Sequence, residues 1–374
     1  VKVNMKKVLF VIHDLGQGGA EKVLVNLVNN MDSVKFDITI MTLFAGGVNE
    51  QFLKPHIKLY SCFDKIFPAN SHILKLFSPK MLYKKFVKDK YDIIVSYLEG
   101  SSARIVSGCT DKNVKLVSWI HIEQHTIKQL ASSFRNSLEA KRCYDKFNMT
   151  VCVSNYVKND FVNILDFEKP IKVLYNTNET NDICLLAKDD EGIDIISDNE
   201  INICVVGKVH MRKGCDRICH IQKRLKDSGL NTHIYFLGKG PDEDYVRNFS
   251  KKYNLEDSIT LLGYQTNPYK FVKNCDLFVC ASLAEGFSTA TTEALILGTP
   301  VVTVEVSGMK EMLGENNEYG IVTENNEDAL YEGIKKMLTT PDLLEAYAAK
   351  AKERGKAFST EKTVKAVEEM LESL

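Results

Sequence analysis

Short apolar runs alternate with longer amphipathic segments through both halves of the chain. The apolar runs are continuous and rich in Val and Ile, which is typical of strands buried on both faces and therefore of parallel sheets covered by helices. The segments between them have helical length, as in Glu21–Asn30 and Asp216–Ser228. The predicted strands are Val8–His13, Asp37–Leu43, Ile57–Ser61, Asp92–Leu98, Lys115–Ile120, Thr150–Ser154, Lys172–Tyr175, Asn202–Gly207, His233–Gly238, Ser258–Gly263, Asp276–Ala281, Val301–Val306 and Gly320–Thr323. This order predicts an α/β protein with two doubly wound, Rossmann-like domains.

The length of 374 residues suits two domains of ordinary size. An acidic stretch without a clear period separates the two series of runs. We therefore expect domains at 1–185 and 200–355 with a linker at 186–199, and a C-terminal helix at 356–374 that packs back on the first domain. Two such domains facing each other would form a cleft lined by the carboxyl ends of both sheets, where open α/β sheets bind their ligands.

The net charge of −1 conceals an asymmetry between the two halves. Residues 1–175 carry a net charge of +9, and residues 176–374 carry −10. A basic front half is expected to meet an anionic partner. The ten cysteines show no CxxC spacing and several lie inside apolar runs, which indicates reduced core cysteines in a cytosolic protein. The first apolar run ends at His13, too early for a signal peptide, and no stretch is long enough to span a membrane.

Residues 70–90 form a basic amphipathic stretch with six lysines and one acid. An ordinary surface helix over the core has the same pattern. The functional alternative is contact with an anionic membrane surface, at which a lipid-linked acceptor would be presented. No aromatic platform motif accompanies the charge, so nucleic acid is not an expected partner.

A glycine turn follows the first predicted strand, with Gly16, Gly18 and Gly19 just before a helix that begins near Ala20. Glycines permit close backbone approach, and a helix N-terminus offers N–H groups and a positive dipole end, so the turn is a candidate anion site. A tight turn without a ligand is the alternative. Neither GxGxxG nor a P-loop lysine is present. The missing GxGxxG and the missing ribose-binding acid argue against an NAD-dependent oxidoreductase.

A second turn, after Asn202–Gly207, concentrates the cations Lys208, Arg212 and Lys213 before another helix. Surface lysines are often merely solvated. At the carboxyl end of the second domain's first strand, however, they suit a ligand with two adjacent negative charges, such as a diphosphate.

The stretch AEGFSTATTEALILGTPVV, which starts at Ala284, places Glu285 in a turn and Glu293 inside the helix that follows. Ser288 or Thr289 can cap the start of this helix, and Gly298 ends it. Backbone N–H groups of residues 286–289 would then hold phosphate oxygens.

The two glutamates are poor neighbours for phosphate but good acceptors for sugar hydroxyls. Glu285 and Glu293 would lie on either side of a bound diphosphate, each holding a different sugar. The alternative is that both simply favour a helix N-terminus.

These motifs together resemble those of a known family. E-G-F-S-T-A-T-T-E at 285–293 resembles the E-x7-E signature of retaining nucleotide-sugar glycosyltransferases of the GT-B fold, family 4. G-G-A-E at 18–21 resembles the family's N-terminal turn, V-V-G-K-V-H-M-R-K-G at 205–214 its phosphate loop, and F-L-G-K-G-P at 236–241 its G-x-G-P strand end. The likeness spans most of the chain and preserves the order of the motifs.

The resemblance implies that the second domain binds a nucleoside-diphosphate sugar, most simply a UDP-sugar. Lys213 matches the family lysine on the diphosphate, while Lys208 stands where arginine is usual. The resemblance places Glu285 on the transferred sugar and Glu293 on the ribose. His121 matches the first-domain histidine that approaches the donor sugar.

The candidate residues form three groups. The catalytic candidates are His121, Lys213 and Glu285. The donor-binding candidates are Gly18, Gly19, Lys208, Gly238, Tyr264, Gly286, Phe287, Ser288, Thr289 and Glu293. The acceptor candidates, at strand ends of the first domain, are His13, Asp14 and Glu99.

The implied activity is retaining hexosyl transfer from the nucleotide sugar to a saccharide, for example one linked to polyprenyl diphosphate, in the synthesis of a surface polysaccharide such as a capsule. The enzyme would work at the inner face of the membrane, with no metal, no cofactor and no side-chain nucleophile. A zinc pair at His121 and His125 and a metal motif at Asp242 and Asp244 are the disfavoured metal interpretations. The alternative function is a non-catalytic GT-B-like subunit that binds a nucleotide or a partner.

Overall fold

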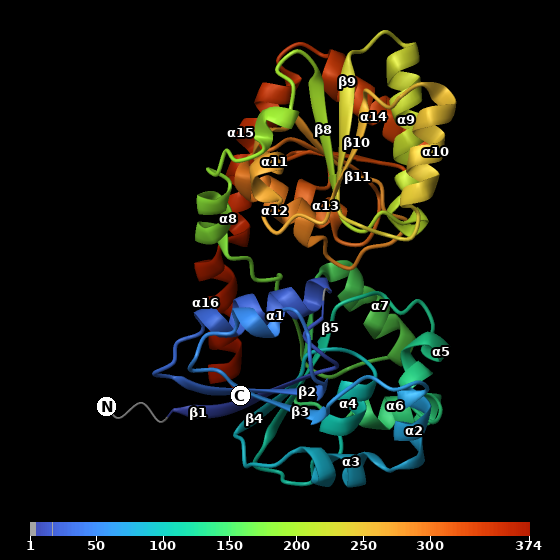
Figure 1. Cartoon of the computed structure of the whole chain (residues 1–374). Helices are drawn as coiled ribbons and strands as arrows, with labels where there is room; N and C mark the ends of the chain where they lie inside the picture. Colours follow the sequence, from blue (N-terminus) through green and yellow to red (C-terminus); the bar gives the residue numbers. More distant parts are fainter. Residues whose placement is uncertain (1–4, 17) are drawn as a thin grey trace. The chain divides into compact units, whose positions relative to one another are not determined.

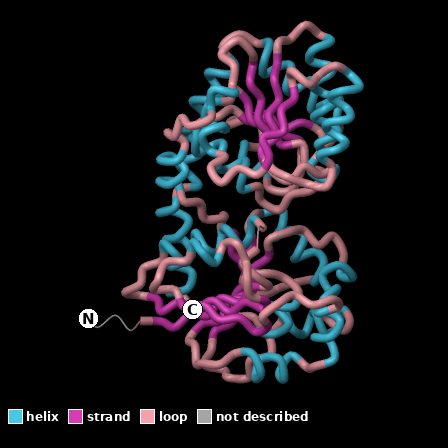
Figure 2. Tube along the Cα trace, viewed as in Figure 1, coloured by secondary structure: helices cyan, strands magenta, loops and turns pink. Residues whose placement is uncertain are grey.

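The computed structural model describes residues 5–16 and 18–374. The chain forms two compact units, the first made of Val1–Asn178 with Thr360–Leu374 and the second of Glu179–Ser359. Each unit is a parallel sheet flanked by helices (Figures 1 and 2). The fold is therefore the predicted α/β fold with two Rossmann-like domains. The stretch 186–199, expected as a linker, lies within the second unit.

The first unit contains a seven-stranded sheet in the order β3-β2-β1-β4-β5-β6-β7, with every pairing parallel. Its strands are β1 (Lys6–Ile12), β2 (Phe36–Phe44), β3 (Lys58–Phe63), β4 (Ile93–Ser96), β5 (Lys115–Ile120), β6 (Met149–Cys152) and β7 (Ile171–Val173). Its α-helices are α1 (Gly19–Asn30), α2 (Asn70–Leu76), α3 (Pro79–Phe86), α4 (Ser101–Val106), α5 (Ile127–Leu130), α6 (Ser137–Tyr144), α7 (Asn155–Leu165) and α16 (Thr360–Glu372). Two 3₁₀ turns complete it, η1 (Glu50–Phe52) and η2 (Ala131–Ser133).

The second unit contains a six-stranded parallel sheet in the order β10-β9-β8-β11-β12-β13. Its strands are β8 (Ile201–Val206), β9 (Thr232–Leu237), β10 (Ile259–Gly263), β11 (Leu277–Cys280), β12 (Val301–Val304) and β13 (Ile321–Thr323). Its α-helices are α8 (Thr180–Leu186), α9 (Cys215–Asp227), α10 (Glu243–Tyr253), α11 (Tyr269–Asn274), α12 (Thr289–Leu297), α13 (Met309–Leu313), α14 (Glu327–Thr339) and α15 (Leu343–Gly355). Its 3₁₀ turns are η3 (Ile193–Ile195), η4 (Met211–Lys213) and η5 (Lys356–Phe358).

Every apolar run that predicts a strand forms one, with ends that differ by a few residues. The central strands are fully buried, as β1 shows from Val8 to Ile12, because helices cover both faces of the sheet. The basic stretch 70–90 is two short helices rather than one. Pro79 cannot continue a helix, and the Ser78 hydroxyl accepts a hydrogen bond from the Met81 amide, so α3 starts afresh after α2.

The C-terminal helix α16 belongs to the first unit, although the chain reaches it only after completing the second. Its buried face carries Val364, Val367, Met370 and Leu371. The Lys6 ammonium donates to the Leu371 carbonyl over 2.9 Å, which fixes the helix against the start of β1.

Both sheets reverse their strand order at one place. In the first unit β1 lies between β2 and β4, and in the second β8 lies between β9 and β11. Connections from the two central strands depart to opposite sides there, so the loops at their carboxyl ends leave room for a ligand. The glycine turn follows β1 and the lysine turn follows β8, each at such a switch point.

Candidate functional site

Three loops meet at the carboxyl end of the second sheet. Gly214 adopts a φ of +74°, and a Cβ added to it would lie 2.2 Å from the Ala281 carbonyl oxygen. A Cβ on Gly238 would lie 1.9 Å from the Gly207 oxygen. Glycine is therefore required where the loop after β8 approaches the ends of β9 and β11.

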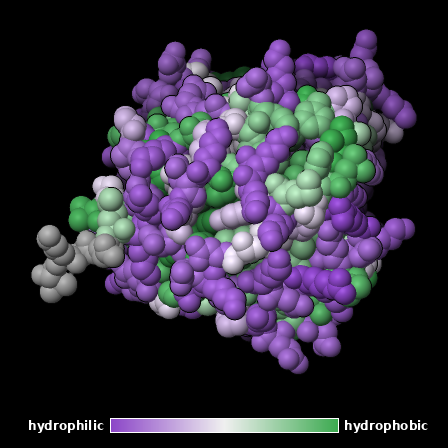
Figure 3. All heavy atoms as spheres, turned by 90° about the horizontal axis from the view of Figure 1, so that it is seen from below, coloured by the Kyte–Doolittle hydropathy of each residue, from purple (hydrophilic) through white to green (hydrophobic). Residues whose placement is uncertain are grey.

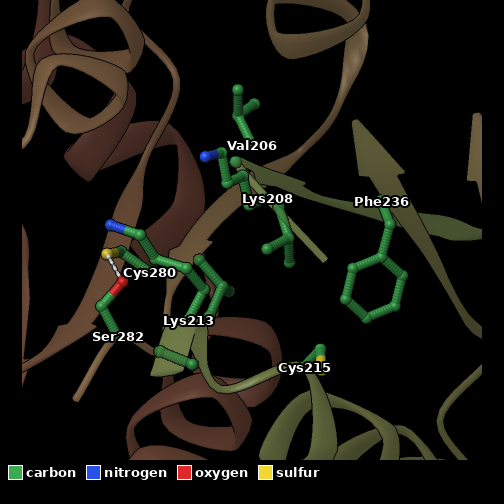
Figure 4. A pocket seen from close by; sticks show the side chains of 11 residues that line it. Val206, Lys208, Lys213, Cys215, Phe236, Cys280 and Ser282 are labelled. Atoms are coloured by element: carbon green, nitrogen blue, oxygen red, sulfur yellow. Dashed lines mark hydrogen bonds between the residues drawn. The ribbon is translucent and has the colours of Figure 1, made fainter. Parts of the chain in front are cut away.

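A pocket lies between these loops (Figure 4). The ammonium groups of Lys208 and Lys213 both point away from Phe236, toward the same side. Burial raises the pKa of the Cys215 thiol to about 11 and also raises the pKa of Cys280, so neither thiol is a thiolate nucleophile at neutral pH. The lining residues are Val205, Val206, Gly207, Lys208, Lys213, Cys215, Phe236, Val279, Cys280, Ala281 and Ser282.

Two of the catalytic candidates are in direct contact. The Lys213 ammonium lies 2.6 Å from Glu285 Oε1, and the Ser282 hydroxyl donates to the same oxygen over 2.6 Å. Lys213 is 40 % exposed and Glu285 15 % exposed. A cation that can reach an anionic ligand thus lies beside a carboxylate that can accept hydroxyl hydrogen bonds.

Helix α12 begins and ends where the sequence predicts. The Ser288 hydroxyl caps it by accepting from the Thr291 amide, and Gly298 ends it at a φ of +76°. Glu293, one turn into the helix, is buried, and the Tyr269 hydroxyl donates to its Oε1 over 3.3 Å.

The other donor candidates after β10 and β11 differ in exposure. The Phe287 side chain is buried and packs edge-on against Phe358 at 5.9 Å, so only its backbone is suited to a ligand. Gly286 and Thr289 flank the helix start, and Tyr264, after β10, is 59 % exposed.

At the start of the first unit, the carboxylate of Asp14 organises the glycine turn. Its Oδ2 lies 2.6 Å from His13 Nδ1, and its Oδ1 accepts from the Gly16 amide over 2.7 Å. Gly18 is the cap of α1 and Gly19 its first residue. Gln17, between the glycines, lies outside the described residues. The acceptor candidates His13 and Asp14 therefore belong to the same loop as the two glycines.

His121 follows β5 and is buried. Burial lowers the pKa of His121 to about 3, against the opposing effect of a hydrogen bond to the Tyr97 backbone, so the imidazole is neutral at physiological pH. Its Nε2 is buried without a hydrogen-bond partner. In a neutral imidazole one ring nitrogen carries the proton and the other a lone pair, so an unpartnered Nε2 can bond a ligand hydroxyl.

Glu99 lies next to His121 and is bonded to its loop. Its Oε1 accepts hydrogen bonds from the backbone amides of His121 and Ile122. Burial raises the pKa of the Glu99 carboxyl, opposed by those backbone hydrogen bonds. The structure thus brings together one catalytic candidate and one acceptor candidate.

The disfavoured metal motifs have other contacts in the structure. His121 is buried whereas His125 is exposed beside Glu123 and Asp160, so the two histidines do not form a pair. In the described part of the chain, one group of side chains could hold a metal ion. It consists of Glu123, His125 and Asp160, whose potential ligand atoms lie within 4.8 Å of one another.

Sequence reasoning missed several residues that position the site. The carboxylate of Asp242, which the sequence offered only as part of a disfavoured metal motif, accepts from the Met211 amide over 2.8 Å and so anchors the lysine turn. Ser282 and Tyr269 bond the two glutamates, and Asp160 bonds the loop after His121. These contacts join segments far apart in the chain, and only the position of Asp242 directly after Gly-Pro offered a signal.

Two protein families match the chain, one for each series of strands. The family described as Glycosyltransferase Family 4 matches residues 17–181, and the family described as Glycosyl transferases group 1 matches residues 189–354.

Sequence similarity to one relative extends over almost the whole chain. The chain is 29% identical to N-acetylgalactosamine-N,N'-diacetylbacillosaminyl-diphospho-undecaprenol 4-alpha-N-acetylgalactosaminyltransferase of Campylobacter jejuni, over 95% of this chain and 96% of that one. It is 23% identical to poly(ribitol-phosphate) alpha-N-acetylglucosaminyltransferase of Staphylococcus aureus, over 72% and 53% of the two chains.

Among solved structures, HepE of Anabaena in complex with UDP and glucose is similar in fold, with a TM-score of 0.77 at 18% identity over 99% of this chain and 100% of that one. The two parallel sheets with their switch-point loops agree with this likeness. The chain is therefore a glycosyltransferase of the GT-B fold, built from a Family 4 domain and a group 1 domain.

Proposed function

We propose that the protein transfers an N-acetylhexosamine from a UDP-sugar to a saccharide linked to polyprenyl diphosphate, with retention at the anomeric carbon. The observation that carries the proposal is the contact between Lys213 and Glu285 beside the pocket at the second switch point. This contact places the Lys213 ammonium, which can bind a diphosphate, beside the Glu285 carboxylate, which can accept hydrogen bonds from sugar hydroxyls. The names of the Campylobacter and Staphylococcus relatives support the class of sugar, and UDP bound to HepE supports the nucleotide.

The donor residues would act in two sets. Lys213 and Lys208, with the amides at the start of α12, would neutralise the diphosphate as it departs. Glu285 would accept hydroxyls of the transferred sugar and the buried Glu293 those of the ribose. Gly238 would allow the nucleotide to approach the end of β9.

The first unit would supply the acceptor site and a neutral histidine. The lone pair on His121 Nε2 would accept a hydrogen bond from a sugar hydroxyl. His13, Asp14 and Glu99 follow the neighbouring strands β1 and β4 and are proposed for the saccharide acceptor.

Retention would follow from a mechanism in which the departing diphosphate takes the acceptor proton on the face it leaves. The protein would then supply charge stabilisation and alignment, with no metal and no covalent intermediate on a side chain. The anomeric configuration of the product, read from proton couplings, tests this part; an inverted product would overturn it.

The test of the activity uses the purified full chain with UDP, several nucleotide sugars and an undecaprenyl-diphosphate-linked saccharide. A nucleotide at 100 times its Kd should add about 2.7 kcal/mol of stability in a thermal-shift assay. We expect the largest shift with UDP compounds and a product that is one N-acetylhexosamine longer. Binding of UDP without transfer would instead indicate a non-catalytic binding subunit, and binding of no nucleotide at millimolar concentration would overturn the site.

An acceptor of this kind lies in a membrane. We propose that a surface formed by helices α2 and α3 contacts the anionic cytoplasmic face of that membrane. No helix in the described part of the chain is long and apolar enough to cross a bilayer. Leu76 is 75% exposed and Met81 57% exposed, on helices whose other face buries Leu82 and Phe86. The α2–α3 surface consists of Ile73, Leu76, Phe77 and Met81 with Lys75, Lys80, Lys84 and Lys85.

Exposed apolar side chains beside lysines are suited to lipid tails and anionic headgroups together. Figure 3, which views the protein from the side of α3, shows hydrophobic groups among hydrophilic ones on that face.

Two arginines hold this surface in place. Arg104, 1% exposed, donates to the carbonyls of Leu74 and Phe77 over 2.9 and 2.7 Å. The Arg135 guanidinium donates to the carbonyls of Lys75 and Leu76. Glu139 accepts from the Arg104 guanidinium and from the Arg135 backbone amide. The last carbonyls of α2 thereby accept hydrogen bonds from arginine side chains, which fixes the end of the helix that carries the exposed Leu76.

Co-sedimentation with phosphatidylcholine vesicles, with and without phosphatidylglycerol, tests the membrane contact. We expect binding only to the anionic vesicles, weakened by salt. The pair Leu76→Glu and Met81→Glu should abolish it, whereas Val34→Glu, at a residue 70% exposed elsewhere in the first unit, should not. Equal binding by all three proteins would show that another surface is responsible.

A further inference from the structure

The loop that follows β5 is bonded by carboxylates at both of its ends. At its start, Glu99 Oε1 accepts from the amides of His121 and Ile122. Further on, Asp160 Oδ2 accepts from the Gln124 amide over 2.6 Å, and its Oδ1 from the His125 amide over 3.1 Å. Each carboxylate accepts hydrogen bonds from two backbone amides of this loop, so together they constrain its backbone at both ends.

The two carboxylates come from elements that the chain builds separately. Glu99 lies between β4 and α4, and Asp160 lies on α7. Between them the loop contains a strained residue, His125, whose φ is +56° although it is not glycine. Such a conformation persists only where the surroundings hold it, and Asp160 bonds the amide of that same residue.

We propose that Asp160 is a positioning residue for the transfer reaction, which acts with Glu99 to fix the loop so that the unpartnered Nε2 of His121 meets a sugar hydroxyl at one geometry. The inference rests on the proposed function. Neither carboxylate needs to touch the substrate for this role. The contacts of Glu99 Oε1 with the amides of His121 and Ile122 carry this role.

The grouping of Glu123, His125 and Asp160 invites a metal ion as the competing explanation. Asp160 already accepts from two backbone amides, and His125 is 61 % exposed with Nδ1 3.8 Å from Asp160. These contacts account for the carboxylate without an ion, so the metal becomes an outcome of the test.

The experiment compares Asp160→Asn and Asp160→Ala with Asp166→Asn. Asp166 is the exposed residue after α7, at a φ of +56° that asparagine also adopts, and its substitution makes the same change of charge. Three quantities are measured on the full chain: kcat of transfer, the Kd of UDP, and the tautomer and titration of His121 by nitrogen NMR.

Asp160→Ala should lower kcat at least about 10-fold, because small misplacements of reacting groups are costly. The Kd of UDP should not change, since the proposed nucleotide site is built from residues 207–293. The pKa of His121 should rise from about 3 toward its ordinary 6.5 as the freed loop admits water. Asp160→Asn, which keeps one acceptor oxygen, should lie between Ala and wild type, and Asp166→Asn should match wild type.

Unchanged kcat and unchanged His121 titration in Asp160→Asn would overturn the proposal, even if Asp160→Ala failed to fold. Activity that EDTA abolishes and a divalent cation restores in wild type, but not in Asp160→Asn, would overturn it in favour of a metal. Failure of the proposed function is separately visible: the wild type would transfer no sugar, while the NMR comparison would still report whether Asp160 holds the loop.

Discussion

At the scale of single residues, the candidate functional side chains are bonded to other groups of the protein. The ammonium of Lys213 lies against Glu285, and Glu99 bonds the amides beside His121. An ion pair of this kind limits the conformations of both side chains, so each stays where the proposed donor needs it. Changing one partner therefore affects the other as well.

Lys213→Ala should abolish transfer and weaken UDP binding, because the diphosphate loses its cation and the carboxylate of Glu285 loses its neutralising partner. The fold should survive, since Lys213 is 40 % exposed. Lys223→Ala is the matched control, because this lysine forms an ion pair with Asp227 on the surface of the same unit. Transfer kinetics and calorimetry with UDP are measured for both variants. An equal loss of transfer and of UDP affinity in the two variants would contradict the assignment of Lys213 to the donor site.

His121 should make the stability of the protein depend on pH. In the folded state burial lowers its pKa to about 3, whereas the unfolded chain takes up the proton near its ordinary pKa of 6.5. The contribution of the neutral ring is present above pH 6.5 and is lost as pH falls toward 3. Between pH 7.5 and 5 the loss should be about 2 kcal/mol.

Urea unfolding at the two pH values, in wild type and His121→Gln, measures this effect. The variant should lose about 2 kcal/mol less than wild type over the same interval. An identical dependence in both proteins would mean that the ring is accessible to protons in the fold.

At the scale of elements, close approach between loops shapes the second switch point. The turn before α9 reaches the end of β11 so closely that Gly214 cannot carry a side chain. The Leu283 amide donates to the Arg212 carbonyl over 2.9 Å across the same contact. Loops that are bonded in this way hold a pocket without help from long side chains.

Gly214→Ala should destabilise the protein by more than about 2 kcal/mol, because a left-handed conformation already costs 1–2 kcal/mol and a clash with the Ala281 carbonyl is added. Gly229→Ala is its control at the other end of α9. There φ is +83° but nothing lies within 4 Å of the added Cβ, so only the conformational cost applies. Thermal unfolding and UDP binding are measured for both; a loss of UDP binding in the control would refute the role of close approach.

At the scale of the whole molecule, the last helix of the chain belongs to the first unit. Helix α16 adds buried apolar side chains, worth about 1.5–3 kcal/mol each, to the unit that begins with β1. Thr360 also donates to the Asn178 carbonyl over 2.6 Å, which joins the residues at which the chain leaves and re-enters this unit.

A chain that ends at Ser359 should therefore lose the first unit and keep the second. The four buried apolar residues of α16 contribute an amount comparable with the roughly 5–15 kcal/mol that stabilises a domain. Hydrogen exchange should show loss of protection in β1 to β7 but not in β8 to β13, whereas deletion of only Ser373 and Leu374 should leave both sheets protected. Protection of both sheets in the long deletion would contradict the assignment of α16.

The sequence by itself determined the two sheets, the capped helix from Thr289 to Leu297 and the loops in which Lys213 and Glu285 lie. Apolar runs, glycines and caps are local signals, and each is read within a few residues of the chain. The tertiary structure decided what those loops touch. It paired Lys213 with Glu285 across more than seventy positions, placed Asp242 on the lysine turn and gave Asp160 the loop of His121. Such contacts depend on how separate elements pack against one another. A local pattern of residues does not encode which distant segment a loop will contact.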